Sequence, residues 1–187
     1  MDNIAIFASH NGSIFDTLYE ASLKKELFIN ISLIISNNQN APILEKANEK
    51  GIPHFVVNDK LYNDVDLTFL NLLEEYNCKY IILAGYMKKI SPKLANQYLI
   101  INSHPALLPK YGGNGMYGRF VHEAVIKNGE KISGVTIHKV NENYDEGEIL
   151  CQKTIQIDKN ETVKTLENKV KELEKIAMVE ALKLCLK

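Results

Sequence analysis

The sequence predicts an α/β protein with a Rossmann-like, mostly parallel central sheet, helices on both faces and an antiparallel pair of strands near the C-terminus. Short apolar runs alternate with helical patterns over the first hundred residues. After Pro109 the composition changes, and a glycine-rich stretch follows. Two segments of alternating polarity then precede a long amphipathic helix. The 187 residues, 45% of them hydrophobic, are enough for one globular domain with a full core.

The first half contains the elements expected of a parallel sheet. One helix is expected to begin at Ser91-Pro92, with Ser as N-cap and Pro at the first helical position. Another helix begins near Ser13 and has Ile14, Leu18, Ala21 and Leu27 on one side. The remaining helices are expected at 42–50, which stops at Gly51, and at 64–76. The buried strands are predicted at 4–8, 29–35, 55–57, 80–84 and 99–101.

The second half has a different pattern. Residues 111–118 hold four glycines, which indicates a loop or a close approach of backbone to a ligand. A short helix over 120–127 follows, and the alternating segments 135–140 and 149–157 are predicted to pair antiparallel. An amphipathic helix over 161–186 closes the domain.

Charge and cysteine content exclude several classes of protein. The formal net charge of −1, from 22 basic and 23 acidic residues, provides no footprint for nucleic acid or an anionic membrane. No apolar run approaches the roughly 20 residues needed to span a bilayer, and the N-terminus lacks a signal-peptide pattern. Cys78, Cys151 and Cys185 are widely separated and lack metal-ligand spacing. We expect reduced thiols in a cytoplasmic protein, with no metal and with neither nucleic acid nor membrane as partner.

The segment 102–109, Asn-Ser-His-Pro-Ala-Leu-Leu-Pro, is the most informative part of the chain. Asn102 and His104 follow an apolar strand and are two residues apart, so both side chains can face one reacting atom. An amide NH2 and an imidazole N–H aimed together would stabilise a developing oxyanion. A buried histidine satisfied by a backbone carbonyl explains His104 equally well at this point.

Asp145, in the sequence Tyr-Asp-Glu-Gly at 144–147, could orient or charge that histidine. Ordinary turn chemistry is the alternative, since Asp-Glu-Gly is a common loop sequence. His138 and His122 are further polar groups in this half, and a structural role is favoured for His138 because it lies in an alternating strand. His10 and His54 are interpreted as solvent-exposed or packing residues.

Two segments of the first half are weaker candidates. Ser9-His10-Asn11-Gly12-Ser13 comes between a strand and a helix, where backbone N–H groups can bind phosphate. The segment matches neither the three-glycine dinucleotide fingerprint nor a P-loop. Taken alone, it is therefore interpreted as an ordinary capped turn between a strand and a helix. Residues 83–92 contain Met87 and could wall a flat heteroaromatic pocket, but ordinary core is favoured by composition.

Taken in order, these motifs resemble the folate-dependent formyltransferase family over nearly the whole chain. The resemblance is carried by the Asn-Gly-Ser turn, by Leu-Ala-Gly-Tyr-Met followed by Ser-Pro, by Asn-Ser-His-Pro-Ala-Leu-Leu-Pro, by Gly-Val-Thr-Ile-His and by Tyr-Asp-Glu-Gly. It implies a Rossmann-like formyltransferase fold and formyl transfer from 10-formyltetrahydrofolate, used as co-substrate without metal or redox cofactor. The Asn-Gly-Ser turn and the length point to the branch that formylates the glycyl amine of glycinamide ribonucleotide in purine biosynthesis.

The resemblance also assigns roles to residues. Residues 1–100 would form a nucleotide- and phosphate-binding half, and 101–187 a catalytic and folate-binding half. The proposed catalytic groups are Asn102, His104 and Asp145, with His138 in support. The phosphate and ribose of the substrate would be bound by Asn11, Gly12, Ser13, Ile14, Lys171 and Glu174. The folate would be bound by Met87, Lys88, Lys89, Ile90, Val140, Asn141 and Tyr144.

The chain departs from the family pattern at several positions. His10 and Ile14 stand where Gly and Asn are common, which a backbone contact to phosphate tolerates. Lys89 stands where an apolar residue is frequent beside the folate. Residues 111–118 are longer than in many relatives and resemble a subgroup with a Gly-Met-Tyr-Gly insertion.

The partners expected are small-molecule substrates, with the protein a monomer or weak homodimer.

Alternative functions stay open. The chain could instead be another 10-formyltetrahydrofolate-dependent amine formyltransferase or a formyltetrahydrofolate hydrolase. From a different class, it could be a non-catalytic module that binds a ribonucleotide or folate.

Overall fold

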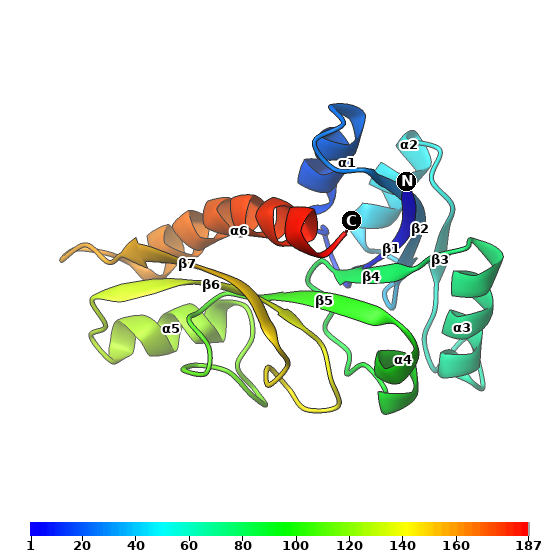
Figure 1. Ribbon diagram of the computed structural model, residues 1–187. Helices are drawn as coiled ribbons and strands as arrows, with labels where there is room; N and C mark the ends of the chain where they lie inside the picture. Colours follow the sequence, from blue (N-terminus) through cyan, green and yellow to red (C-terminus); the bar gives the residue numbers. More distant parts are fainter. Residues whose placement is uncertain (187) are drawn as a thin grey trace. The chain divides into compact units, whose positions relative to one another are not determined.

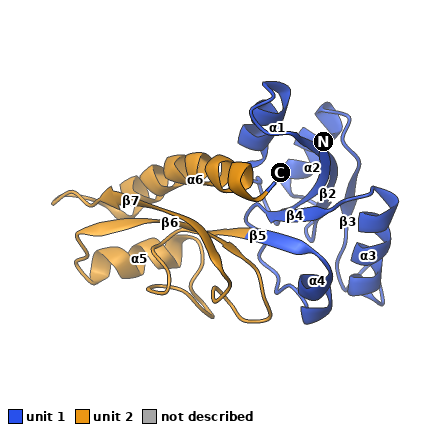
Figure 2. Ribbon diagram, viewed as in Figure 1, with its two compact units in different colours: residues 1–101, 186 blue, residues 102–185, 187 orange. Residues whose placement is uncertain are grey.

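The computed structural model describes residues 1–186, which divide into two compact units (Figure 2). The first contains Met1–Ile101 together with Leu186, and the second contains Asn102–Cys185. The division falls inside strand β5, Leu99–His104, so this strand contributes residues to both units. Each unit is described by itself.

The first unit is built on parallel strands in the order β3-β2-β1-β4-β5 (Figure 1). The pairs β1–β2, β1–β4 and β2–β3 are all parallel. Strand β1 is buried from Ile4 to Phe7, as expected of a central strand covered on both faces. The strands that lie wholly within this unit are β1 Asp2–Phe7, β2 Ile29–Ser36, β3 His54–Val56 and β4 Tyr80–Leu83.

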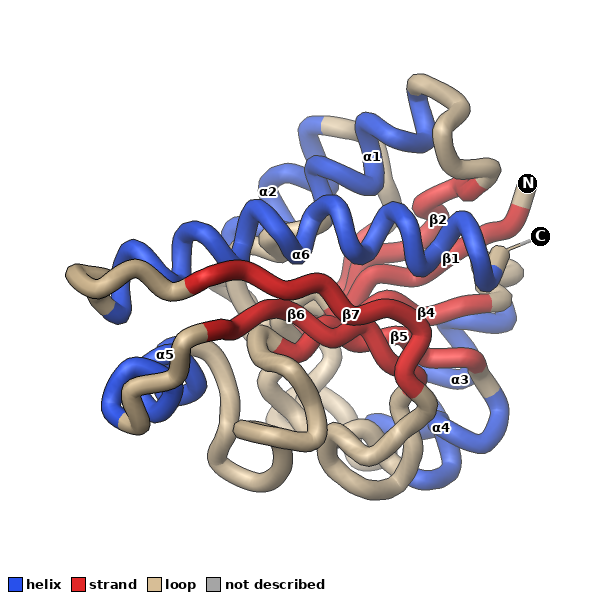
Figure 3. The backbone as a smooth tube through the Cα atoms, turned by 60° about the vertical axis from the view of Figure 1, so that its left-hand side comes forward, coloured by secondary structure: helices blue, strands red, loops and turns tan. Residues whose placement is uncertain are grey.

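Helices cover both faces of these parallel strands. Right-handed crossovers place α1 and α2 on one face and α3 and α4 on the other, as Figures 1 and 3 show. Two helix starts follow from the sequence, since Asp64 and Ser91 cap α3 and α4 by accepting the N–H of Leu67 and Leu94. The helices are α1 Phe15–Leu23, α2 Pro42–Glu49, α3 Val65–Glu75 and α4 Pro92–Gln97.

The second unit contains the end of β5 and an antiparallel pair of strands in the order β5-β6-β7. Strands β6 (Ile132–Lys139) and β7 (Ile149–Gln156) pair with an irregularity between Ile137 and His138. Helix α5 spans Arg119–Lys127, and the long helix α6 spans Val163–Cys185. Helix α6 packs along β6 and β7 through a stripe of buried residues that includes Leu166, Val170 and Met178.

The fold class predicted from the sequence is confirmed, with local differences at element ends. Helix α1 begins at Phe15 and ends at Leu23, so Leu27 is buried but lies beyond the helix. Strand β5 continues to His104, three residues past the predicted end. This extension makes Asn102 and His104 part of the strand itself. Among the residues described, no helix is long and apolar enough to cross a membrane.

Candidate active site

Asn102 and His104 lie in the last three residues of β5, within the second unit. Asn102 is half-buried and His104 is 3% exposed. Since they are two residues apart in a strand, their side chains leave the same face. The extended backbone therefore allows the Asn102 and His104 side chains to point in the same direction, as the sequence predicts.

His138 of β6 is hydrogen-bonded to Asn102. Its Nδ1 lies 2.9 Å from the carbonyl oxygen of Lys139, and its Nε2 lies 3.2 Å from Nδ2 of Asn102. With Nδ1 donating to this carbonyl, a neutral ring accepts the Asn102 amide through Nε2, whereas a ring that also carries a proton on Nε2 donates toward Asp145 instead. His138 is 2% exposed, and its position fixes the orientation of the amide.

Asp145 lies between the two imidazoles. Its Oδ2 is 3.4 Å from Nδ1 of His104, and its Oδ1 is 3.5 Å from Nε2 of His138. The same Oδ2 accepts the backbone N–H of Gly113 at 2.9 Å. The structure thus brings together Asn102, His104 and Asp145, which the sequence alone could not establish, and places His138, the residue expected in support, between Asn102 and Asp145.

The other nitrogen of His104 faces a backbone carbonyl. Its Nε2 lies 2.7 Å from the carbonyl oxygen of Tyr111, so acceptors flank the ring on both sides. Burial lowers the pKa of His104 below its usual value of 6.5, while the Asp145 carboxylate and the Tyr111 carbonyl oppose this shift. His104 is therefore both buried against a carbonyl and placed beside a carboxylate, so the two interpretations of the sequence are compatible.

The carboxyl group of Asp145 is held in its ionised form. Burial raises its pKa, but contacts with His138, His104 and the Gly113 N–H outweigh burial, and the net pKa is lowered. The backbone of Asp145 is left-handed, with φ 59°. Asp is one of the few non-glycine residues that adopt this conformation routinely in turns.

Thr136 was not singled out from the sequence, yet it fixes the turn that follows His104. Its hydroxyl donates to the Ala106 carbonyl at 2.7 Å and accepts the Leu108 N–H at 3.0 Å. Gln152 of β7 donates to the Leu108 carbonyl at 3.0 Å. The only sequence feature that could have indicated Thr136 is the alternating pattern of β6. Thr136 lies two residues before His138, on the same face of the strand, and is fully buried.

The other predicted site residues of the second unit lie on α6 and in the loop after β6. Lys171 is paired with Glu167, with 2.5 Å between Nζ and Oε1. Burial raises the pKa of Glu174. In the loop, Val140 is half-buried, whereas Asn141 and Tyr144 are exposed. Lys171 is exposed and Glu174 is half-buried.

The predicted phosphate turn opens helix α1 in the first unit. Gly12 has φ 62°, and its carbonyl accepts the N–H of Phe15 at 2.9 Å. A Cβ at this position would clash with the side chain of Ile43. Ile14 is fully buried, so its side chain belongs to the core, while Asn11 is exposed and Ser13 half-buried. Gly12 is buried as well.

The segment after β4 is tied to the same turn region by Ser9. The Ser9 hydroxyl accepts the N–H of Met87 at 2.7 Å and donates to Asn37 at 2.5 Å. Met87 is 46% exposed and Ile90 is 5% exposed. Lys88 and Lys89, the other predicted folate-binding residues in this segment, are exposed.

The remaining histidines and cysteines lie outside these clusters. His10 is exposed, and Nδ1 of His54 lies 2.9 Å from the Ile52 carbonyl. His122 of α5 is 2% exposed, and its Nδ1 has no hydrogen-bond partner. All three cysteines are free. In residues 1–186 no group of three or more His, Cys, Asp or Glu side chains is placed to hold a metal ion.

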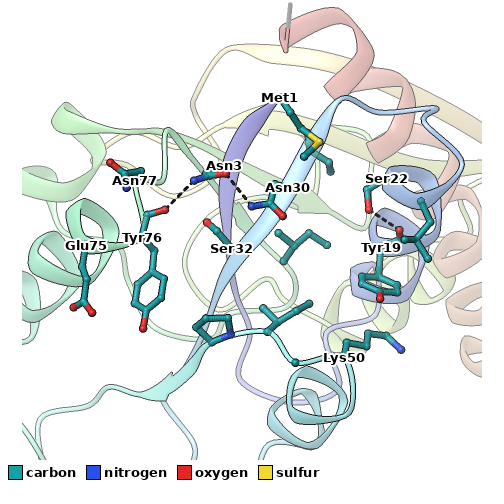
Figure 4. A pocket seen from close by; sticks show the side chains of 16 residues that line it. Met1, Asn3, Tyr19, Ser22, Asn30, Ser32, Lys50, Glu75, Tyr76 and Asn77 are labelled. Carbon is teal, nitrogen blue, oxygen red and sulfur yellow. Dashed lines mark hydrogen bonds between the residues drawn. The ribbon is translucent and has the colours of Figure 1, made fainter.

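A cavity of about 650 Å³ lies at the amino ends of the strands of the first unit (Figure 4). Its polar groups are hydrogen-bonded to one another: Asn3 donates to the Tyr76 carbonyl, Asn30 donates to Asn3, and Ser22 donates to the Tyr19 carbonyl. Ligands of open α/β sheets bind at the carboxyl ends of strands, which is the opposite edge. The cavity is therefore not the candidate site.

Comparisons with known proteins agree with this description. The model of the family described as "Formyl transferase" matches residues 2–182. A phosphoribosylglycinamide formyltransferase of Bacillus subtilis is 32% identical over 93% of this chain and 89% of its own length. The chloroplastic enzyme of the same name from Arabidopsis thaliana is 35% identical over 89% of this chain, but the match spans only 59% of its length.

Solved structures show the same fold. The phosphoribosylglycinamide formyltransferase of Bacillus halodurans superposes with a TM-score of 0.90 at 30% identity, covering 100% of this chain and 96% of that one. A formyltetrahydrofolate deformylase of Pseudomonas syringae gives a TM-score of 0.85 at 23% identity over 97% of this chain and 60% of that one. At that identity the likeness concerns the fold alone, so the fold does not distinguish transfer from hydrolysis.

Proposed function

Because the chain belongs to the formyl transferase family, we propose that it transfers a formyl group from 10-formyltetrahydrofolate to the glycyl amine of glycinamide ribonucleotide. The observation that carries the proposal is the cluster of Asn102, His104, His138 and Asp145 at the end of β5. This set of an amide, imidazoles and a carboxylate supplies the hydrogen-bond donors and the charge that formyl transfer needs. The reaction belongs to purine biosynthesis, and a cytoplasmic location is part of the proposal.

The first step is attack of the amine on the formyl carbon, which turns the formyl oxygen into an oxyanion. Asn102 donates to this oxygen through its amide NH2, whose orientation is fixed by His138. His104 is the second proposed donor, most strongly as imidazolium; because its two N–H groups face the Tyr111 carbonyl and Asp145, its hydrogen bond to the oxyanion is shared with one of these acceptors. The Asp145 carboxylate favours that charged form by its proximity, against the effect of burial.

In the second step the intermediate collapses. The bond between the formyl carbon and N10 of the folate breaks, and the amine nitrogen keeps the formyl group. A proton must pass from the attacking amine to the leaving nitrogen, and Asp145 with His104 is the proposed relay. The reaction consumes no oxidant or metal, because the products are formylated amine and tetrahydrofolate.

Binding of the two substrates is assigned to the residues named from the sequence. Asn11, Gly12, Ser13 and Ile14 would hold phosphate through backbone N–H groups at the start of α1, with Lys171 and Glu174 on the ribose. The departures at His10 and Ile14 fit this assignment, since the buried side chain of Ile14 leaves its backbone to do the binding. The folate would be held by the segment from Met87 to Ile90 and by the loop containing Val140, Asn141 and Tyr144.

The test is an assay with three acceptor conditions. Purified protein is incubated with 10-formyltetrahydrofolate and glycinamide ribonucleotide, and deformylated folate is followed by absorbance. Parallel reactions omit the nucleotide or replace it with free glycinamide. Release that requires the ribonucleotide is the expected result, because the phosphate turn contributes binding energy that free glycinamide lacks.

Two other outcomes would contradict the proposal. Folate release without any acceptor would identify a hydrolase. Binding of folate without release under any condition would leave another amine acceptor or a non-catalytic binding module. Repeating the assay with other amine acceptors separates these last two possibilities, because a binding module releases no deformylated folate with any of them.

A further inference from the structure

Tyr111 has a strained backbone and an anchored side chain. Its φ of 58° lies in the left-handed region that non-glycine residues seldom adopt. Its phenol donates to Glu130 Oε1 at 2.9 Å and accepts from Nδ2 of Asn128 at 3.0 Å. The hydroxyl therefore has a donor and an acceptor in place, and Tyr111 is held from the chain segment that follows α5.

The anchor determines where the carbonyl of Tyr111 points. That oxygen lies 2.7 Å from Nε2 of His104, the shortest contact of the ring among those described above. The segment is also fixed two residues later, where the Gly113 N–H donates to Asp145. A Cβ at Gly112 would lie 2.5 Å from Leu108 Cδ2 and 3.2 Å from Asp145 Cβ, so a larger residue there would require the Leu108 side chain and Asp145 to shift.

We propose that Tyr111 is a positioning residue, whose carbonyl, anchored through its phenol to Glu130 and Asn128, holds the His104 imidazole in its working orientation beside Asp145. Nothing in the family assignment gives Tyr111 this role. The inference rests on the proposed function for its effect on turnover, while its effect on the imidazole is independent of any substrate.

The environment of His104 explains why the carbonyl matters. The Asp145 carboxylate faces its Nδ1, and the His138 ring lies on the far side of that carboxylate. His138 opposes a positive charge on His104, and His122 is electrostatically coupled to it from α5. The Tyr111 carbonyl and Asp145 are thus the two groups that favour the protonated ring, and loss of either shifts its pKa downward.

The test compares Tyr111→Phe with two further variants. Tyr111→Phe keeps the ring and removes the anchor. Glu130→Gln weakens the same anchor from the other side while Tyr111 stays intact. Lys110→Gln is the matched control, since Lys110 also pairs with Glu130, at 3.1 Å, but its side chain is 71% exposed. Thermal denaturation of each variant establishes that it is folded.

Two readouts are needed. The first is the titration midpoint of the His104 imidazole, followed by NMR on histidine-labelled protein without substrates and assigned with His104→Gln. The second is kcat and KM of formyl transfer. For Tyr111→Phe and Glu130→Gln we expect a lower midpoint, and a kcat lower by about two- to tenfold with KM unchanged, as loss of one hydrogen bond predicts. Lys110→Gln should match wild type in both.

A purely structural Tyr111 would lower thermal stability and leave both midpoint and kcat unchanged, which would overturn the inference. A shift in Lys110→Gln equal to that in Tyr111→Phe would do the same. Absence of formyl transfer in wild type, together with a shifted midpoint in Tyr111→Phe, would overturn the proposed function and leave the positioning role intact.

Discussion

The turn after β1 and the end of β5 are both polar segments at the carboxyl end of a strand, yet they are built in different ways. At the end of β5 the side chains of Asn102, His104, His138 and Asp145 are linked by contacts and are largely buried. In the turn from Asn11 to Ile14, Gly12 has a left-handed backbone and the side chain of Ile14 is buried. The proposed function assigns catalysis to the side chains of the first region and phosphate binding to the backbone of the second. Substitutions should therefore affect rate in the first region and binding in the second.

The largest expected effect is at β5. Asn102→Ala or His104→Ala removes one donor to the developing oxyanion, which costs roughly 3–4 kcal/mol, or about 10²–10³-fold in kcat. Binding of glycinamide ribonucleotide, measured by calorimetry, should persist within a few-fold. His54→Ala is a suitable control, since His54 also contacts a backbone carbonyl, at 2.9 Å, outside the cluster. Near wild-type turnover in either β5 variant would remove that residue from the proposed mechanism.

The next effect concerns the carboxylate. Asp145→Asn keeps the shape and removes the charge that favours a protonated His104, so we expect turnover to fall about ten- to a hundredfold. The sign follows from the pKa: without this charge the pKa of His104 falls further, and the alkaline limb of the kcat/KM profile moves to lower pH. Glu146→Gln in the same turn is the control, because Glu146 is exposed and contacts Asn143. An unchanged profile in Asp145→Asn would reduce Asp145 to a turn residue.

The two regions also differ in how far they could be predicted from the sequence. Residue types and spacing made Asn102, His104 and Asp145 candidates, and the family resemblance supplied the catalytic roles proposed for them. The parallel strands and capped helices followed from local patterns such as Ser91-Pro92. These features depend on nearby residues, which a pattern can describe.

What the sequence could not supply depends on long-range contacts and on backbone conformation. The alternating strand pattern favours a structural role for His138, and only the family resemblance places it in support of the catalytic groups; in the structure it contacts Asn102 and Asp145. The Tyr111 carbonyl carries no signature in residue type, and its approach to His104 requires a left-handed φ in a glycine-rich loop. Contacts between main-chain and side-chain atoms distant along the chain have no periodic pattern to indicate them.

A smaller effect would sharpen the contrast at the phosphate turn. Gly12→Ala adds a Cβ that clashes with Ile43 and strains a left-handed backbone. We expect KM for the ribonucleotide to rise about tenfold with kcat nearly unchanged, since about 1.4 kcal/mol of binding corresponds to tenfold. Gly51→Ala is a close control: its φ is 64°, but nothing lies within 4 Å of the added Cβ. Equal KM values for these two variants would refute a binding role for the turn.

The smallest effect concerns stability in acid, and it tests whether the buried histidines of the second unit are held neutral. Burial lowers the pKa of both His104 and His122 below 6.5, so the unfolded chain binds their protons first as pH falls. The free energy of unfolding should be fully present above pH 6.5 and decline below it, by at most about 1.4 kcal/mol per pH unit for each histidine.

His122 is the cleaner of the two for this measurement, because its Nδ1 has no hydrogen-bond partner and the proposed mechanism does not use it. His122→Asn should reduce the slope of unfolding free energy against pH, measured by urea denaturation between pH 5 and 7, while His10→Asn at an exposed position leaves it unchanged. An unaltered slope in His122→Asn would mean that the ring becomes protonated in the folded protein as readily as in the unfolded chain. The acid sensitivity would then have to come from His104 and the network around Asp145.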